Sequence, residues 1–346
     1  MQEVIAMTIK PLDGFRVVEF EGIGPGPLCG RILAGFGAEV TLIARSGGGG
    51  LVETLAGNTA NPLTDGKRIV PLDLKTPGGV QRALELVAQA DALIEGNRPG
   101  VMERLGLGPA ECAKANPRLV YGRMTGWGQD GPLAQAAGHD LNYVALSGLL
   151  SLPVIAGRVP AIPPGTGDAA GALGLAIGIT LGVLRAVKTG QGSVVDAAIV
   201  DVMAMLGGLP FFLAATGALG GDKPSMVHES PFYDTYRCQD GGYITICAME
   251  PQFYALLLQK LKLHDVDRGR QYRSTDWPAL KARMEALFLS QPRQHWCELL
   301  EGTDVCFAPV LSVEEARSHP HNVARGTFAD ATHPAPAPRF SPIPAA

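Results

Sequence analysis

The side chains that could do chemistry in this sequence leave few reaction types open. No Gly-x-Ser-x-Gly turn is present to expose a serine nucleophile, and no His-Glu-x-x-His is present to hold a catalytic zinc ion. The six cysteines are scattered without a Cys-x-x-Cys pair, which predicts reduced thiols and no metal site. Acid/base catalysis by histidine and carboxylate side chains therefore remains as the chemistry to consider.

A glycine- and proline-rich turn at residues 22–27 invites comparison with dinucleotide-binding folds. It reads Gly-Ile-Gly-Pro-Gly-Pro, which does not satisfy Gly-x-Gly-x-x-Gly, and its prolines lack backbone donors that a pyrophosphate needs. The second apolar run of the chain ends at Arg45, where NAD-binding folds carry an acidic residue. An arginine there suits a phosphorylated ribose, so the sequence predicts either NADP or the 3′-phospho-ADP of coenzyme A at this position.

The elements that must position such groups are predicted from alternating β-branched runs and helical patterns. Pro25 and Pro27 open a helix that Gly37 closes, and Thr76 caps a second helix that runs to Ala90. Alternation of this kind predicts a parallel sheet covered by helices, a Rossmann-like arrangement. The strands are expected at residues 16–20, 39–43, 69–72, 92–94 and 119–123.

Further along the chain, long apolar helices are expected after two aspartates. Asp168 suits the N-cap of the first of these helices, and the second follows Asp196. The uncharged stretches 169–184 and 202–221 approach the length of membrane spans, but their glycines and Pro210 favour buried helices instead. A Gly47–Gly50 run is expected to form a flexible loop.

The chain is expected to fold as two domains. Residues 1–220, joined by the tail 327–346, form a large Rossmann-like α/β domain, and residues 225–326 form a smaller α+β domain. The smaller domain is predicted from a strand at 243–247, helices near 251–261 and 277–289, and a capping box of Ser312 and Glu315.

Bulk properties restrict the partners. The 346 residues carry a formal net charge of -4, which gives no reason to expect a nucleic-acid partner. The N-terminus lacks a basic-then-apolar secretory pattern, and the C-terminal Ile-Pro-Ala-Ala matches no peroxisomal signal. We therefore expect a cytoplasmic enzyme that does not engage a membrane.

Three segments resemble the active-site segments of 2-methylacyl-CoA racemases within the class III CoA-transferase (CaiB/BaiF) family. They are residues 138–143 (Gly-His-Asp-Leu-Asn-Tyr), 167–171 (Gly-Asp-Ala-Ala-Gly) and 248–254 (Ala-Met-Glu-Pro-Gln-Phe-Tyr). Shorter matches at 17–19, 24–27, 72–75, 98–101, 103–108, 126–129 and 276–278 extend the resemblance to about Gly326. Each piece alone is weak, but the combination in this order is highly specific.

The resemblance implies an interlocked homodimer that racemises 2-methylacyl-CoA thioesters through an enolate, without metal or redox cofactor. His139, supported by Glu250, would serve one face of the substrate and Asp168 the other, because inversion needs a base and an opposed acid. The active site would be shared, with Glu250 facing the large domain of the partner. Coenzyme A contacts are implied for Arg45, Leu72, Asp73, Leu74, Lys75, Arg98, Arg104, Gly138, Asp140, Leu141, Asn142 and Tyr143.

Two other functions stay open at this point. A class III CoA transferase would use Asp168 as a nucleophile that carries an acyl anhydride, and such enzymes typically have an aromatic residue in place of His139. A protein that binds acyl-CoA without catalysis is the second alternative. The chain departs from the family at Ala44-Arg45-Ser46, where an acid usually precedes the arginine, and it lacks the C-terminal helical extension of longer relatives. The acyl group itself cannot be read from the sequence.

Overall fold

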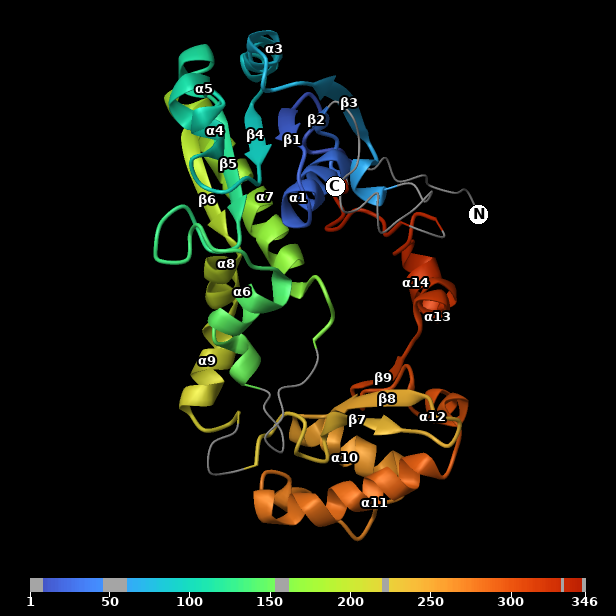
Figure 1. Cartoon of the computed structure of the whole chain (residues 1–346). Coiled ribbons are helices and arrows are strands. Elements are labelled where there is room, and N and C mark those ends of the chain that lie inside the picture. The colour runs from blue at the N-terminus through green and yellow to red at the C-terminus, as the bar shows by residue number, and fades with distance from the viewer. Residues whose placement is uncertain (1–8, 46–60, 153–161, 220–223, 331–332, 344–346) are drawn as a thin grey trace, which may run out of the picture. The chain divides into compact units, whose positions relative to one another are not determined.

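The computed structural model describes residues 9–45, 61–152, 162–219, 224–330 and 333–343 (Figure 1). The predicted Gly47–Gly50 loop lies outside these residues. The chain divides into two compact units. The first comprises residues 1–147, 162–206 and 332–346, and the second comprises residues 148–161 and 207–331.

A six-stranded parallel sheet organises the first unit, in the order β3-β2-β1-β4-β5-β6. This order places the reversal of strand sequence between β1 and β4, where open α/β sheets form their ligand crevice. The five predicted strands are present, several with one or two more residues, and the edge strand β6 was not predicted. Their bounds are β1 (Arg16–Phe20), β2 (Glu39–Arg45), β3 (Lys67–Leu72), β4 (Ala92–Glu95), β5 (Val120–Thr125) and β6 (Ser193–Ala198).

The helices of this unit begin largely where the sequence predicts. α1 opens at Pro25, and the Thr76 hydroxyl accepts a hydrogen bond from Gly79 N to cap α3. α3 ends at Val87 rather than at Ala90, because the Asn116 side chain bonds the carbonyls of both residues and replaces a further helical turn. The helices are α1 (Pro25–Gly35), α3 (Pro77–Val87), α4 (Val101–Arg104), α5 (Pro109–Ala115), α6 (Asp140–Leu146), α7 (Thr166–Thr189) and α8 (Ile199–Leu206).

Helix α7 packs on β5 and β6 and extends along the sheet (Figure 1). Its side chains Leu175 and Ile179 are fully buried, and a Cβ atom at Gly122 of β5 would stand 2.9 Å from Leu175 Cδ1. The helix is long and apolar enough to cross a membrane by length and composition alone. One face of the helix packs in the core, as predicted, whereas Leu173, Ile177, Leu181 and Leu184 on the other face are exposed. The second apolar stretch is broken, because α8 ends at Leu206 and α9 (Gly208–Ala215) begins in the other unit.

The second unit is built on an antiparallel sheet in the order β7-β8-β9. Helices α10 and α11 bury one face of the sheet around Phe232, Tyr236 and Phe288. The predicted strand, both predicted helices and the capping box of Ser312 and Glu315 are confirmed. The bounds are β7 (Tyr233–Arg237), β8 (Tyr243–Cys247), β9 (Phe307–Val310), α10 (Pro251–Lys260), α11 (Trp277–Leu289), α12 (Arg293–Leu300), α13 (Val313–Ser318) and α14 (Pro320–Arg325).

The unit boundaries differ from the predicted domain ranges. The described residues 148–152 and 207–219, which were predicted in the large domain, group with the second unit. Their described parts meet locally, because a Cβ atom at Gly148 would lie 3.7 Å from the Phe211 ring. The tail was predicted to join the large domain from residue 327, and its described residues 333–343 group with the first unit. Apolar composition alone does not show which core a helix such as α9 joins.

Candidate functional site

A cavity of roughly 580 Å³ opens at the carboxyl ends of β1, β4 and β5, at the reversal of strand order. We call it the central cavity. The turn 22–27 forms one wall, residues 96–99 form a second, and Gly126 with Trp127 continue from β5. His139, Asp140, Tyr143 and Asp168 also line it. The structure therefore brings His139 and Asp168 together in one cavity, although they are 29 positions apart in the sequence.

Asp168 lies in the first turn of α7, half-buried. The N-cap is Gly165 in a left-handed conformation, so the prediction that Asp168 caps the helix is wrong. Its carboxylate faces the turn after β1, where a Cβ atom at Gly24 would stand 2.8 Å from Asp168 Oδ2. Gly24 also has φ 66° and ψ -122°, a conformation that a side chain disfavours. Both facts require glycine at this point of the cavity.

The cap of α7 comes instead from Asp140, the first residue of α6. Asp140 Oδ2 accepts a hydrogen bond from Gly165 N, and Oδ1 accepts one from Asp168 N, each at 2.9 Å. Two of the free amides at the start of α7 are satisfied in this way by a residue from another helix. The amide groups that Asp168 would have bonded as an N-cap are thus bonded to the carboxylate of Asp140 instead.

His139 is the exposed residue that precedes α6 on the cavity wall. Its backbone N–H donates to Asn142 Oδ1 at 3.0 Å, which closes the first turn of the helix. One turn further, the Tyr143 ring packs edge-on against Trp127, with centroids 4.7 Å apart and an interplanar angle of 82°. This aromatic pair fixes the start of α6 against the loop after β5 and leaves the imidazole exposed.

Burial and neighbouring charges shift the pKa of the Asp168 carboxyl group. Burial raises the pKa of its carboxyl group, the negative charge of Asp140 raises it further, and a positive His139 would lower it. Burial and the Asp168 charge also raise the pKa of the Tyr143 hydroxyl. A carboxylate whose pKa is raised by desolvation and a neighbouring acid, in a cavity, is typical of a group that takes and returns protons.

A second cavity of roughly 420 Å³ lies beside the first, at the ends of β2 and β3. We call it the side cavity. Arg45 and the predicted residues from Leu72 to Lys75 line it, together with Val101 and Leu105. Phe20 and Asn97 line both cavities, so the two spaces adjoin. An elongated ligand could extend from Arg45 past Asn97 to Asp168.

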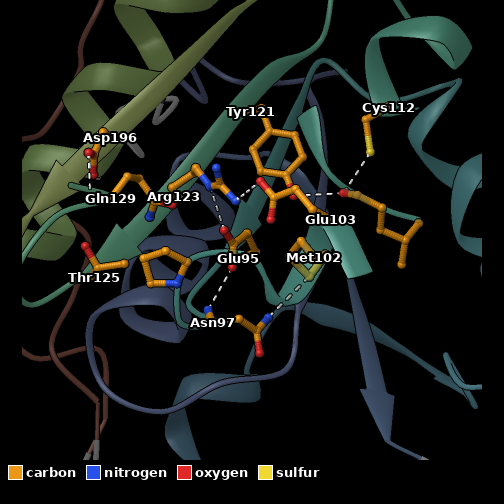
Figure 2. A network of polar contacts seen from close by, with 12 residues as sticks. Glu95, Asn97, Met102, Glu103, Cys112, Tyr121, Arg123, Thr125, Gln129 and Asp196 are labelled. Carbon is orange, nitrogen blue, oxygen red and sulfur yellow. Dashed lines mark hydrogen bonds and ion pairs between the residues drawn. The ribbon is translucent and has the colours of Figure 1, made fainter. Parts of the chain in front are cut away.

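The segment that separates the two cavities is held by a buried network (Figure 2). Arg123 on β5 donates to Glu95 at 3.0 Å and to Glu103 at 2.7 Å, and the other oxygen of Glu95 accepts the Asn97 N–H at 2.7 Å. Glu95 is 1% exposed. The Asn97 side chain also donates to Met102 Sδ. These contacts fix residues 96–99 between the two cavities.

The other predicted residues divide into two groups. Gly138 and Arg98 line the central cavity, whereas Arg104, Leu141 and Asn142 line neither cavity. Glu250 belongs to the second unit, where it is exposed at the N-cap of α10. Burial is the main cause of the raised pKa of the Cys306 thiol, and the negative charge of Glu250 raises it further. The Glu250 carboxylate therefore lies near Cys306, the residue before β9.

Sequence reasoning missed residues whose roles depend on packing. Asn97 was not singled out, although it directly precedes Arg98, and Trp127 was noted only as part of a matching segment. Gly24 was noted only as part of the glycine- and proline-rich turn and of a matching segment, and not as a residue against Asp168. The end of a β-strand followed by a polar residue signals Asn97 in a doubly wound fold, because ligands bind at carboxyl ends of strands. In the part of the chain that the structure describes, no group of three His, Cys, Asp or Glu side chains could hold a metal ion.

Comparisons with known proteins agree with this geometry. Residues 12–345 match CoA-transferase family III. The alpha-methylacyl-CoA racemase of Mus musculus is 40% identical over 339 residues, 96% of this chain and 86% of that protein. The acetyl-CoA:oxalate CoA-transferase of Acetobacter aceti is 31% identical over 332 residues, 91% of this chain and 84% of that protein. A crystal structure of Rv3272 from Mycobacterium tuberculosis gives a TM-score of 0.77 at 28% identity, over 98% of this chain and 93% of that one. The chain therefore belongs to CoA-transferase family III.

Proposed function

We propose that this protein racemises 2-methylacyl-CoA thioesters by moving the proton on the carbon next to the thioester carbonyl. The observation that carries the proposal is a histidine and a carboxylate on separate helices of one cavity, with the carboxylate pKa raised. Inversion needs one base to remove the proton and an opposed acid to deliver another. The relatives named racemase share more identity with this chain than the oxalate transferase does, which supports the same choice.

In the proposed reaction the two groups exchange roles with the hand of the substrate. With one enantiomer, ionised Asp168 takes the proton and a protonated His139 returns one to the opposite face. With the other enantiomer, neutral His139 takes the proton and protonated Asp168 delivers its own proton to the opposite face. The raised pKa of Asp168 favours this exchange, because a group that must act in both forms works best near the ambient pH.

The remainder of the substrate would occupy the side cavity. Arg45, at the end of β2, would bind the 3′-phosphate of coenzyme A, and residues Leu72 to Lys75 would line the adenosine end. The pantetheine arm would then pass Asn97 toward the central cavity. Proton transfer next to a thioester uses acid and base groups alone, so we propose no metal or redox cofactor; coenzyme A enters as part of the substrate. All six cysteines are free thiols, which supports a cytoplasmic location.

We infer further that the enzyme works as a homodimer in which Glu250 of one chain supports His139 of the other. The exposed face of α7 supports a partner, since Leu173, Ile177, Leu181 and Leu184 are each more than half exposed and lie along one stripe. A second copy would bury this stripe in a two-fold interface.

Complementation tests the shared site. Chains with His139→Ala and chains with Glu250→Gln would each fail to invert the substrate on their own. Mixed after dissociation, they should recover activity of about a quarter of the wild-type value, because half of the dimers are mixed and each has one intact site. A mixture that stays inactive while sedimentation shows mixed dimers would contradict a shared site.

The alternative is acyl transfer with Asp168 as the nucleophile. Relatives named as transferases, such as the acetyl-CoA:oxalate CoA-transferase, make this reaction a second candidate. Incubation of wild-type protein with a 2-methylacyl-CoA in deuterated water separates the two reactions. Racemisation predicts deuterium at the carbon next to the carbonyl, observed as a mass increase. A transferase predicts no label, and hydroxylamine would trap an acyl group on Asp168. That second pattern would overturn the proposal.

A further inference from the structure

The carboxylate of Asp140 joins two helices at the catalytic cavity. It belongs to the first residue of α6, directly after His139, and its two oxygens each accept an amide hydrogen bond from the first turn of α7. One of those amides is that of Asp168 itself. The two candidate acid/base residues are therefore linked through a single side chain, by way of one peptide bond on one side and one hydrogen bond on the other.

The surroundings leave this carboxylate little freedom. A Cβ atom at Gly167 would stand 2.9 Å from Asp140 Oδ1, so a side chain at this position would press on the Asp140 carboxylate. On the opposite side, the turn 22–27 limits Asp168, because Gly24 lies directly against its Oδ2. Asp168 is thus held on two sides: Asp140 bonds its backbone N–H, and Gly24 lies against its carboxylate.

We propose that Asp140 is a positioning residue, whose carboxylate fixes the first turn of α7 and thereby sets the place of Asp168 in the central cavity. This inference rests on the proposed function of Asp168 as a proton-transferring group. The family resemblance alone implies that Asp140 contacts coenzyme A. The inference instead gives its side chain the role of holding α7.

The same contact carries an electrostatic consequence. The titratable groups that shift the pKa of Asp168 are Asp140 and His139, and Asp168 in turn raises the pKa of Tyr143; all three come from the start of α6. The turn 22–27, which faces Asp168 from the other side, contains only glycine, proline and isoleucine. Removing the Asp140 charge should therefore lower the pKa of Asp168, since no other negative group that acts on it would replace that charge.

The test compares Asp140→Asn with Asp91→Asn. Asn at position 140 keeps the shape and one acceptor but removes the charge. Asp91 is a matched control, because its carboxylate also accepts a backbone amide, that of Arg16 at 2.9 Å, at the amino end of the sheet and outside both cavities. Deuterium exchange of a 2-methylacyl-CoA is measured against pH for each variant, with kcat and KM determined separately.

We expect Asp140→Asn to lower kcat at least tenfold, to leave KM within about twofold, and to move the acid limb of the pH profile to lower pH. Asp140→Glu, which keeps the charge, should return the limb toward the wild-type position. Asp91→Asn should leave the profile unchanged. A raised KM with an unmoved limb would instead make Asp140 a substrate-binding residue and would overturn the inference.

A measurement without turnover separates this inference from the function on which it rests. The carboxyl group of Asp168 can be followed by ¹³C NMR in aspartate-labelled protein, with its signal assigned by Asp168→Asn. A lower titration midpoint in Asp140→Asn supports the inference even if wild-type protein exchanges no deuterium, an outcome that would refute only the racemase proposal. An unchanged midpoint in folded Asp140→Asn would refute the inference whatever the activity.

Discussion

Replacing Gly24 with alanine should damage the catalytic cavity at one defined point. The new Cβ atom would lie 2.8 Å from Asp168 Oδ2, well below the 3.4 Å at which ordinary van der Waals contact begins. The carboxylate must move away, yet its backbone N–H is held by Asp140 at 2.9 Å. Since a misplacement of about 1 Å at a reacting group costs on the order of a hundredfold in rate, we expect kcat/KM to fall ten- to a hundredfold.

The same change also costs stability, because alanine disfavours φ 66° with ψ -122°. A residue held in such a region loses on the order of 1–3 kcal/mol. Gly14→Ala provides the matched control: Gly14 has φ 75°, and nothing lies within 4 Å of its added Cβ. It should therefore lose stability without contact with the cavity.

The assay is deuterium exchange and inversion of a 2-methylacyl-CoA, measured at equal concentrations of folded protein, with urea unfolding of both variants. We expect both variants to lose stability and only Gly24→Ala to lose activity beyond its folded fraction. If Gly24→Ala retained wild-type kcat/KM once folded protein is counted, the placement of Asp168 against this turn would be wrong.

Three further substitutions test other parts of the account. Arg45→Ala should raise KM for acyl-CoA about ten- to a hundredfold, as loss of a charge-assisted contact of roughly 1.5–3 kcal/mol predicts, and should spare 3′-dephospho substrates; an equal effect on both would refute the phosphate contact. Lys67 on β3 and Glu19 on β1 form an ion pair whose two side chains are fully buried. Lys67→Met leaves Glu19 without its cation and should lower the free energy of unfolding by about 3–5 kcal/mol at pH 8. Burial raises the pKa of Glu19 to about 7 even beside Lys67, so the folded state binds a proton more tightly than the unfolded state, and the loss in urea unfolding should be smaller at pH 5. Arg123→Met should raise KM more than it lowers kcat, because Glu95 then holds residues 96–99 less firmly; unchanged KM would show that the network serves stability alone.

The first strands and helices could be predicted because their signals are local. Thr76 with Pro77 marks a helix start, and buried runs such as residues 92–94 mark central strands of a parallel sheet. β6 was missed because it is an edge strand, half-exposed and interrupted by Asp196. That aspartate looked like a helix start, whereas its carboxylate accepts a hydrogen bond from the backbone N–H of Gln129, in the loop after the neighbouring strand β5. An edge strand of this kind carries no continuous apolar run to detect.

In the candidate site, too, some features could be predicted from the sequence and others depend on contacts between distant segments. His139 and Asp168 were identified by resemblance, and their common cavity follows from the strand order. The cap of α7 could not be predicted, because Asp140 reaches it from a different helix and no local pattern records that contact. The proximity of Gly24 to Asp168 likewise depends on the packing of α1 against α7, which composition does not specify.

The central claim, that one group removes a proton and an opposed group delivers another, is tested most directly by exchange with single enantiomers. Each of His139→Ala and Asp168→Ala is incubated with the separate R and S forms of a 2-methylacyl-CoA in deuterated water, and both label and configuration are measured. We expect neither variant to invert the substrate, and each to exchange only one enantiomer, a different one in the two variants, because the surviving base still reaches its own face. Loss of all activity in Asp168→Ala together with wild-type inversion by His139→Ala would contradict the account.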